Sequence, residues 1–180
     1  MSINQHFVEK NQVVLGFNPV ALNAGAPTVD WVSMKGYGRC AIVFIKAVGT
    51  NGDDPTLSFK QATAVAGTNS KVLAVTRIDK KQAATNLTAV GTFTKSTSDS
   101  PASNDTFNTA NGTWTNSDLA EQAAVVIADI KAEDLDVANG FDCVSVTIAD
   151  VGTNAQLGTL LFILHEPKNR KETLESAIVD

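Results

Sequence analysis

Short apolar or alternating runs bounded by Gly, Asn, Asp and Pro are the feature that most constrains the fold of this chain. The run Cys40 to Ala47 (CAIVFIKA) is apolar at both odd and even positions, as is typical of a central strand. Asp142 to Asp150 alternates instead, and Leu157 to His165 is a last apolar run that Pro167 ends. Such runs predict an antiparallel β domain.

The remaining strand candidates follow the same pattern. For Asp142 to Asp150, alternation places Val144, Val146 and Ile148 on one face and Cys143, Ser145 and Thr147 on the other. Glu121 to Ile130 is Ala-rich enough for a helix, but its β-branched residues favour a strand. The other candidates are Val13 to Phe17, Val29 to Met34, Leu57 to Lys60, Lys71 to Ile78 and Ala89 to Thr94. Eight or nine strands predict an all-β, antiparallel β-sandwich or barrel with extended terminal arms, a jelly roll being one candidate form.

The domain organisation follows from where these runs stop. We expect one β domain over residues 13–166, with an N-terminal arm over 1–12 and a C-terminal tail over 167–180. A polar stretch at about 95–118 contains only two large apolar residues, Phe107 and Trp114. Such a stretch has too little apolar area to offset its ordering entropy, so it predicts an exposed loop or a segment that orders against a partner.

Charge and hydropathy exclude several classes of function. The net charge of −5, without any cluster of Lys and Arg, argues against nucleic-acid binding. No apolar run approaches the roughly 20 residues of a membrane-spanning helix, and the first ten residues carry no export signal, so we expect synthesis in the cytoplasm and no membrane partner. Cys40 and Cys143 lie far apart inside strand patterns, which predicts buried free thiols.

The sequence holds few residues with which to build a catalytic or metal site. His6 and His165 are the only histidines, no Gly-x-Ser-x-Gly elbow occurs, and Gly36-Tyr37-Gly38 precedes a strand and therefore predicts a turn. Four acids could bind calcium in principle, but a solvated turn is the favoured interpretation; they are Asp129, Glu133, Asp134 and Asp136. We therefore expect no enzyme activity, no cofactor and no metal.

Several segments of the chain resemble a family of small virion proteins of tailed bacteriophages. The resemblance lies in Ile127 to Ile130, in Glu133 to Val144 (EDLDVANGFDCV) and in the ending Ser176 to Asp180, with weaker support from Val32 to Phe44 and Phe59 to Ala64. It covers most of the chain except the polar stretch at 95–118. These proteins are regarded as head decoration or stabilisation proteins, and the resemblance supplies no catalytic residue.

The resemblance implies a capsid decoration (cement) protein that binds the phage major capsid protein as a homotrimer at the capsid surface, after synthesis in the host cytoplasm. Many symmetric copies would each add a modest contact. The alternatives are a carbohydrate- or receptor-binding virion module, with Trp114 and Tyr37 lining a sugar site, and a head-completion or tail component. The expected interface residues are Phe7, Phe107, Trp114, Arg170, Leu174 and Ile178.

Overall fold

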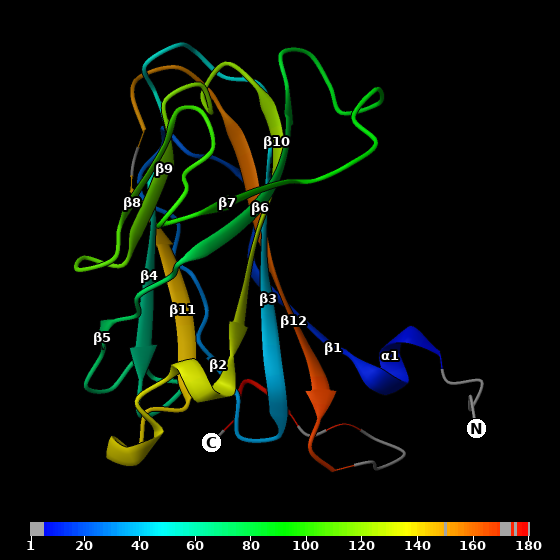
Figure 1. Cartoon of the computed structure of the whole chain (residues 1–180), viewed down its shortest axis with the longest axis vertical. Coiled ribbons are helices and arrows are strands. Elements are labelled where there is room, and N and C mark those ends of the chain that lie inside the picture. Colours follow the sequence, from blue (N-terminus) through cyan, green and yellow to red (C-terminus); the bar gives the residue numbers. More distant parts are fainter. Residues whose placement is uncertain (1–5, 150, 170–173, 175, 180) are drawn as a thin grey trace.

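The chain forms a β-sandwich of two antiparallel sheets (Figure 1). The computed structural model describes residues 6–149, 151–169, 174 and 176–179. Sheet A has the order β1 (Gln12–Ala21), β12 (Leu157–Pro167), β3 (Tyr37–Lys46), β10 (Ala123–Lys131), β6 (Arg77–Ala83), β7 (Thr94–Thr97). Sheet B has the order β2 (Val32–Ser33), β11 (Cys143–Ile148), β4 (Leu57–Ala62), β9 (Thr113–Asn116), β8 (Asp105–Asn108), with β5 (Lys71–Val72) paired to β4. The predicted all-β sandwich is confirmed, and neither sheet closes into a barrel.

Sheet A places alternate residues of its long central strands in the core. On β3, Cys40, Ile42 and Phe44 are buried, and β12 and β10 each bury every second residue beside them. The unbroken registers of β3 with both neighbours keep these side chains on one face. The strand predictions for 40–47, 121–130 and 157–165 are therefore confirmed to within a few residues.

Sheet B supplies the other wall of the core through β11 and β4. Val144, Val146 and Ile148 are buried as predicted, but Cys143 and Ser145 on the opposite face are buried too. The reason is that the chain preceding β2 lies over this face, where the Ser145 hydroxyl donates to the Asp30 carbonyl at 2.8 Å. Cys40 and Cys143 are both buried thiols and form no disulfide, as expected.

Three strand predictions are wrong. Residues 71–78 are divided between β5 and the start of β6, which lie in different sheets. Residues 89–93 form no strand, and only two residues of the 29–34 segment form β2. Leu73 and Val75 are buried in the core from irregular chain and not from a ladder, whereas Phe93 in the 89–93 segment is 44% exposed.

The polar stretch at 95–118 contains β7, β8 and β9 and is neither an exposed loop nor a free extension. Gly112 adopts φ +63° in the turn of the β8–β9 hairpin, a conformation that suits glycine. Its carbonyl accepts a hydrogen bond from the Phe59 amide at 2.8 Å, which ties the turn to β4. The ordering entropy is thus offset within the chain itself.

Trp114 is the centre of this hairpin and not an exposed anchor. Its side chain is 0% exposed, it pairs with Leu57 across the β4–β9 ladder and it belongs to the core cluster. Phe107, opposite Trp114 on β8, is partly buried against the same cluster. Both expected interface residues therefore serve the fold.

The two chain ends meet the body at the same end of the sandwich. The short helix α1 (Phe7–Lys10) precedes β1 and projects sideways (Figure 1), while Pro167 pairs with Tyr37 and the Lys168 amide donates to the Gly36 carbonyl. Two 3₁₀ turns, η1 (Ala132–Asp134) and η2 (Val137–Asn139), form the expected reversal before β11. Among the described residues, no helix is long and apolar enough to cross a bilayer.

Replacing Trp114 by Ala tests its role in the core. We expect Trp114→Ala to lower the free energy of unfolding by about 3–5 kcal/mol, because a large buried side chain leaves a cavity. Trp31→Ala is the control, since Trp31 is only half-buried and its loss should cost clearly less. Urea unfolding curves of both variants measure this, and equal losses would contradict the placement of Trp114.

Candidate interaction surface

The expected interface residues are distributed unevenly between the core and the surface. Phe7 on α1 is 57% exposed and Ile178 is 50% exposed, so both are free to contact another molecule. Leu174 is partly buried against the core, and Arg170 lies outside the described residues. Trp114 is buried and Phe107 is partly buried, so Phe7 and Ile178 are the exposed anchors among the expected residues that the structure describes.

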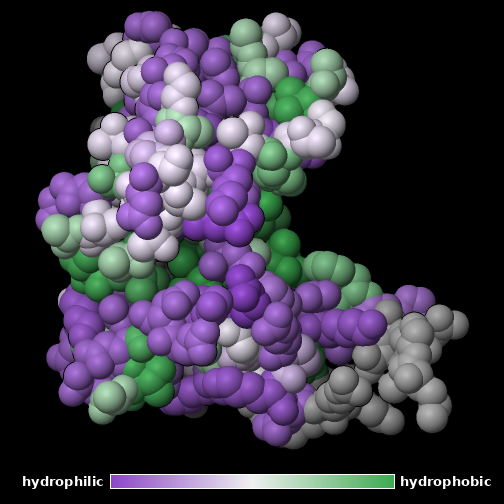
Figure 2. Space-filling model, in the orientation of Figure 1, coloured by the Kyte–Doolittle hydropathy of each residue, from purple (hydrophilic) through white to green (hydrophobic). Residues whose placement is uncertain are grey.

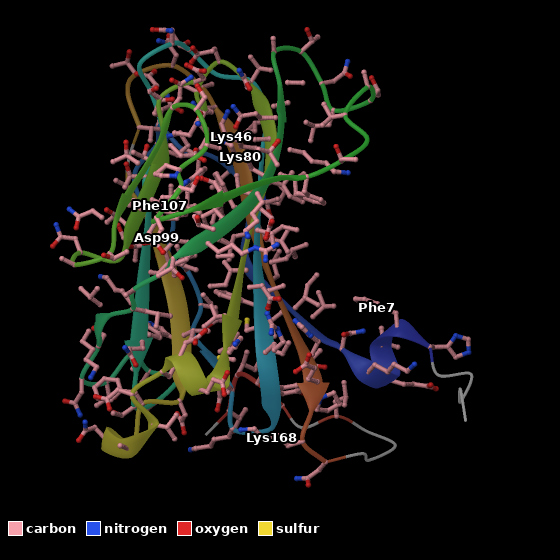
Figure 3. The ribbon with its side chains drawn as sticks, in the orientation of Figure 1. Phe7, Lys46, Lys80, Asp99, Phe107 and Lys168 are labelled. Carbon is pink, nitrogen blue, oxygen red and sulfur yellow. The ribbon has the colours of Figure 1, made fainter. Side chains whose placement is uncertain are left out.

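Phe7 and Ile178 lie at the same end of the sandwich, which we call the terminal end, but on different sides of it: α1 is beside β1 and β12, and residues 176–179 are beside β2 (Figure 1). The terminal end comprises α1 and residues 176–179, together with the chain around Tyr37 and Lys168 (Figure 3). The Ala177 carbonyl accepts a hydrogen bond from the Ser33 amide at 2.6 Å, and the Ala177 side chain is buried, so this part of the tail is fixed to β2. Ile178 and Val179 next to that anchor are exposed, and so are Phe7 and Val8 on α1.

A second surface is the outer face of sheet A, which points away from sheet B. One lateral row crosses four strands through Leu15, Leu161, Val43 and Ile127, each paired with the next. The flanking rows are formed by Val13, Ile163 and Ala41, and by Thr159, Ile45 and Val125. The central strands are thus apolar on the outside as well as in the core.

Leu15 and Ile45 are two of the exposed members of these rows, and Val13 on β1 is a third, at 44%. Leu15 and Ile45 are 45% and 37% exposed, on the edge strand and on a central strand respectively. Figure 2 shows hydrophobic residues in the hollow between the lobe that contains the β6–β7 loop and the lower part that carries α1. The outer face is therefore an apolar, recessed surface.

Charged residues border the outer face in pairs of opposite sign. Arg39 donates from Nε and Nη2 to the Asp129 carboxylate, at 2.7 Å in the shortest hydrogen bond, and this hydrogen bonding raises the pKa of Arg39. His165 lies 3.3 Å from the same carboxylate. On β6, Arg77 and Asp79 pair at 2.8 Å. Lys81 and Lys95 lie on the same side of the sheet, opposite Val125 and Asp79, and form no ion pair among the described residues.

The sheets are joined internally by an ion pair that the sequence pattern did not reveal. Lys80 on β6 reaches across the core to Asp105 on β8, with 2.6 Å between Nζ and Oδ1 and side-chain exposures of 5% and 0%. The Asn116 amide donates to the same oxygen at 2.8 Å, and the Lys80 ammonium lies 5.9 Å from the Trp114 ring centroid. These contacts attach the 95–118 segment to sheet A.

Lys46 is a second buried lysine at an inward position of sheet A. Its ammonium donates to the carbonyls of Leu119, Ala120 and Gln122 at 2.6, 3.1 and 2.6 Å, which holds the crossing from β9 to β10. Burial lowers the pKa of Lys46 to about 8, and the carboxylates of Asp54 and Glu121 act against this shift. Its hydrogen bonds therefore belong to the fold.

The acidic cluster and the remaining surfaces do not assemble a metal or catalytic site in the described part of the chain. Asp129 and Glu133 each lie next to a cation, Arg39 and Lys131, and Asp136 accepts hydrogen bonds from Lys71 and Asn139. Within the described ranges, no three His, Cys, Asp or Glu side chains gather to hold an ion.

An open groove of about 600 Å³ beside β1 is lined by residues 15–18, 20, 21 and 24–30, of which only Asp30 is charged.

Breaking the Lys80–Asp105 pair tests its part in joining the sheets. Lys80→Met leaves the Asp105 carboxylate buried without its cation, and we expect a loss of about 3–5 kcal/mol in the free energy of unfolding. The double variant Lys80→Met/Asp105→Leu should lose less than the sum of the two single variants. Arg77→Met, which removes an exposed pair on the same strand, is the control and should lose far less. Additive single losses would show that the pair is not coupled.

The lowered pKa of Lys46 predicts a pH dependence of stability. Between about pH 8 and about pH 10.5 the unfolded lysine keeps its proton while the folded one has lost it, so stability rises with pH across this window. We expect the wild-type chain to gain roughly 1–2 kcal/mol relative to Lys46→Met over that range, allowing for solvent near the ammonium. Urea titrations of both proteins from about pH 7 to about pH 11 measure the difference. A difference that does not change with pH would refute the shift.

Comparison with known proteins adds no relative to this description: no family model, no curated protein and no solved structure matches the chain. The resemblance to tailed-phage virion proteins therefore stays a prediction. The terminal end and the outer face of sheet A are the two surfaces from which a function can be argued.

Proposed function

We propose that this protein is a capsid decoration protein, which binds the major capsid protein of a tailed phage and stabilises the assembled shell. The observation that carries the proposal is the terminal end, where Phe7, Val8, Ile178 and Val179 are exposed around a fixed body. Aromatic and aliphatic side chains that project in this way are suited to fill pockets on a partner. The binding surface would thus lie at one end of the sandwich.

The build of the body supports a role in passive binding. The sandwich is joined by buried polar contacts at Lys80 and Lys46, so it can present the terminal end as a rigid unit. A rigid unit loses little conformational entropy when it docks. On a symmetric shell, many such copies add their contacts, and modest individual affinities become a large total.

The carbohydrate-binding alternative loses the residues that were expected to form its site. Trp114 is 0% exposed and Tyr37 is 1% exposed, so neither presents a ring face to a sugar. A tail or head-completion role would use the same terminal end and differs in copy number per particle. Capsid decoration remains the function that we propose.

The stabilising role is tested with particles that lack the protein. On heating, capsids without the protein should lose their contents at a lower temperature than decorated capsids. On dilution from high salt, they should lose their contents at a salt concentration that decorated capsids still withstand, because each missing copy removes a contact. Adding the purified protein back should restore the resistance. Equal resistance of bare and decorated capsids to heating and to dilution into low salt would refute the role.

The terminal end is tested by one substitution with a matched control. Phe7→Ser should weaken capsid binding about tenfold or more, as expected for an exposed aromatic anchor at an interface. Phe93→Ser removes an equally large exposed ring from the β6–β7 loop, at the opposite end of sheet A, and should bind like the wild type. Co-sedimentation of each variant with capsids measures the effect, and equal binding by both variants would exclude the terminal end.

A further inference from the structure

The central strands of sheet A are built to be covered on both faces, but the described chain covers only one. Sheet B fills the inner face, where Ile42, Phe44 and Phe162 are buried. In Figure 1, α1 leaves one end of the outer face and the β6–β7 loop extends at the other, and no described helix or strand lies over the rows between them. Strands that are apolar on both faces normally occur where both faces are packed.

We propose that the outer face of sheet A is a self-association surface, on which a second copy of this chain packs with its own outer face. The copies would meet with these faces directed toward a shared symmetry axis, as closed homo-oligomers do. The inference goes beyond the proposed function and does not depend on a capsid.

The size of the apolar area fits an interface between copies. Four strands about 4.8 Å apart, with about five residues each at roughly 3.3 Å per residue, give an area of roughly 300 Å² for the rows. An apolar patch of a few hundred Å² is often functional on a soluble protein, and this one has the size of the apolar centre of an interface of about 800 Å² per partner. The paired charges around it would form the polar border that such interfaces have.

The charges at the border limit how a second copy can pack. Arg39 and Arg77 each pair with an aspartate of the same chain. Lys81, opposite Val125, and Lys95, opposite Asp79, form no ion pair among the described residues. Two copies therefore meet on the apolar rows with these lysines at the solvated edge of the contact, because an unpaired charge is costly to bury.

Light scattering coupled to size-exclusion chromatography tests the proposal on the full chain. The wild type should elute at a multiple of its 18.9 kDa mass. Leu15→Glu and Ile45→Glu should each shift the mass to 18.9 kDa, because they place a charge in the apolar rows. Val137→Glu, at a 59% exposed position on η2, should leave the oligomer intact. A wild type that remains monomeric at about 100 μM, well above the micromolar range of specific contacts, would overturn the proposal, as would both face variants keeping the wild-type mass.

A cross-linking experiment keeps the test decisive if a glutamate variant fails to fold. Cys40 and Cys143 are buried, and burial raises the pKa of the Cys40 thiol, so an introduced surface thiol should react first. With bis-maleimides of several lengths, Ile45→Cys should yield a covalent dimer and Val137→Cys should not. The absence of a dimer from Ile45→Cys would overturn the assignment.

The same variants separate this inference from the capsid role. If the wild type is oligomeric but does not bind capsids, self-association is supported and the proposed function is refuted. A monomeric wild type whose capsid binding is lost in Ile45→Glu would instead assign the outer face to the capsid protein and overturn self-association. The two proposals can therefore fail independently.

Discussion

Apolar residues occupy both faces of β3, β10 and β12, and the rest of the structure depends on how these two faces are covered. The inner face is buried by sheet B, which fixes the register of the central ladders because a shift by one residue would exchange the two faces. The outer face has the same kind of side chains without a described cover. The fold of one chain and the association of several are thus two consequences of the same strand composition.

The polar groups of the interior determine how the less apolar part of the chain joins this core. Lys80 draws Asp105 and the β8–β9 hairpin onto sheet A, and Lys46 holds the crossing that leads from β9 to β10. Each buried lysine costs desolvation and is compensated by specific partners, which favours one arrangement of the 95–118 segment over its alternatives. The terminal end is left free at the other end of the sandwich, where a partner can reach it.

The sequence was sufficient to predict the sandwich and its central strands, because residues such as Ile42 and Val43 leave no polar face at all. It was misleading for Trp114, whose polar neighbours suggested an exposed segment, although Asn111-Gly112 between two alternating runs is a hairpin signal that could have corrected this. It could not show that Lys80 and Asp105 meet, since a lysine in an alternating run is ordinarily assigned to the surface. For the outer face, the sequence showed only that Cys40 to Ala47 is apolar at both odd and even positions. That neighbouring strands extend this apolar face could be recognised only from the order of the strands in sheet A.

Hydroxyl-radical footprinting of the full chain over a range of concentrations tests the central claim most directly, because it reports the accessibility of individual side chains. If the outer face of sheet A is covered by another copy, Leu15 and Ile45 should become protected from oxidation as the concentration rises, while Val137 stays equally reactive. If Leu15 and Ile45 are oxidised at every concentration to the extent that their exposure in the single chain predicts, the account is contradicted.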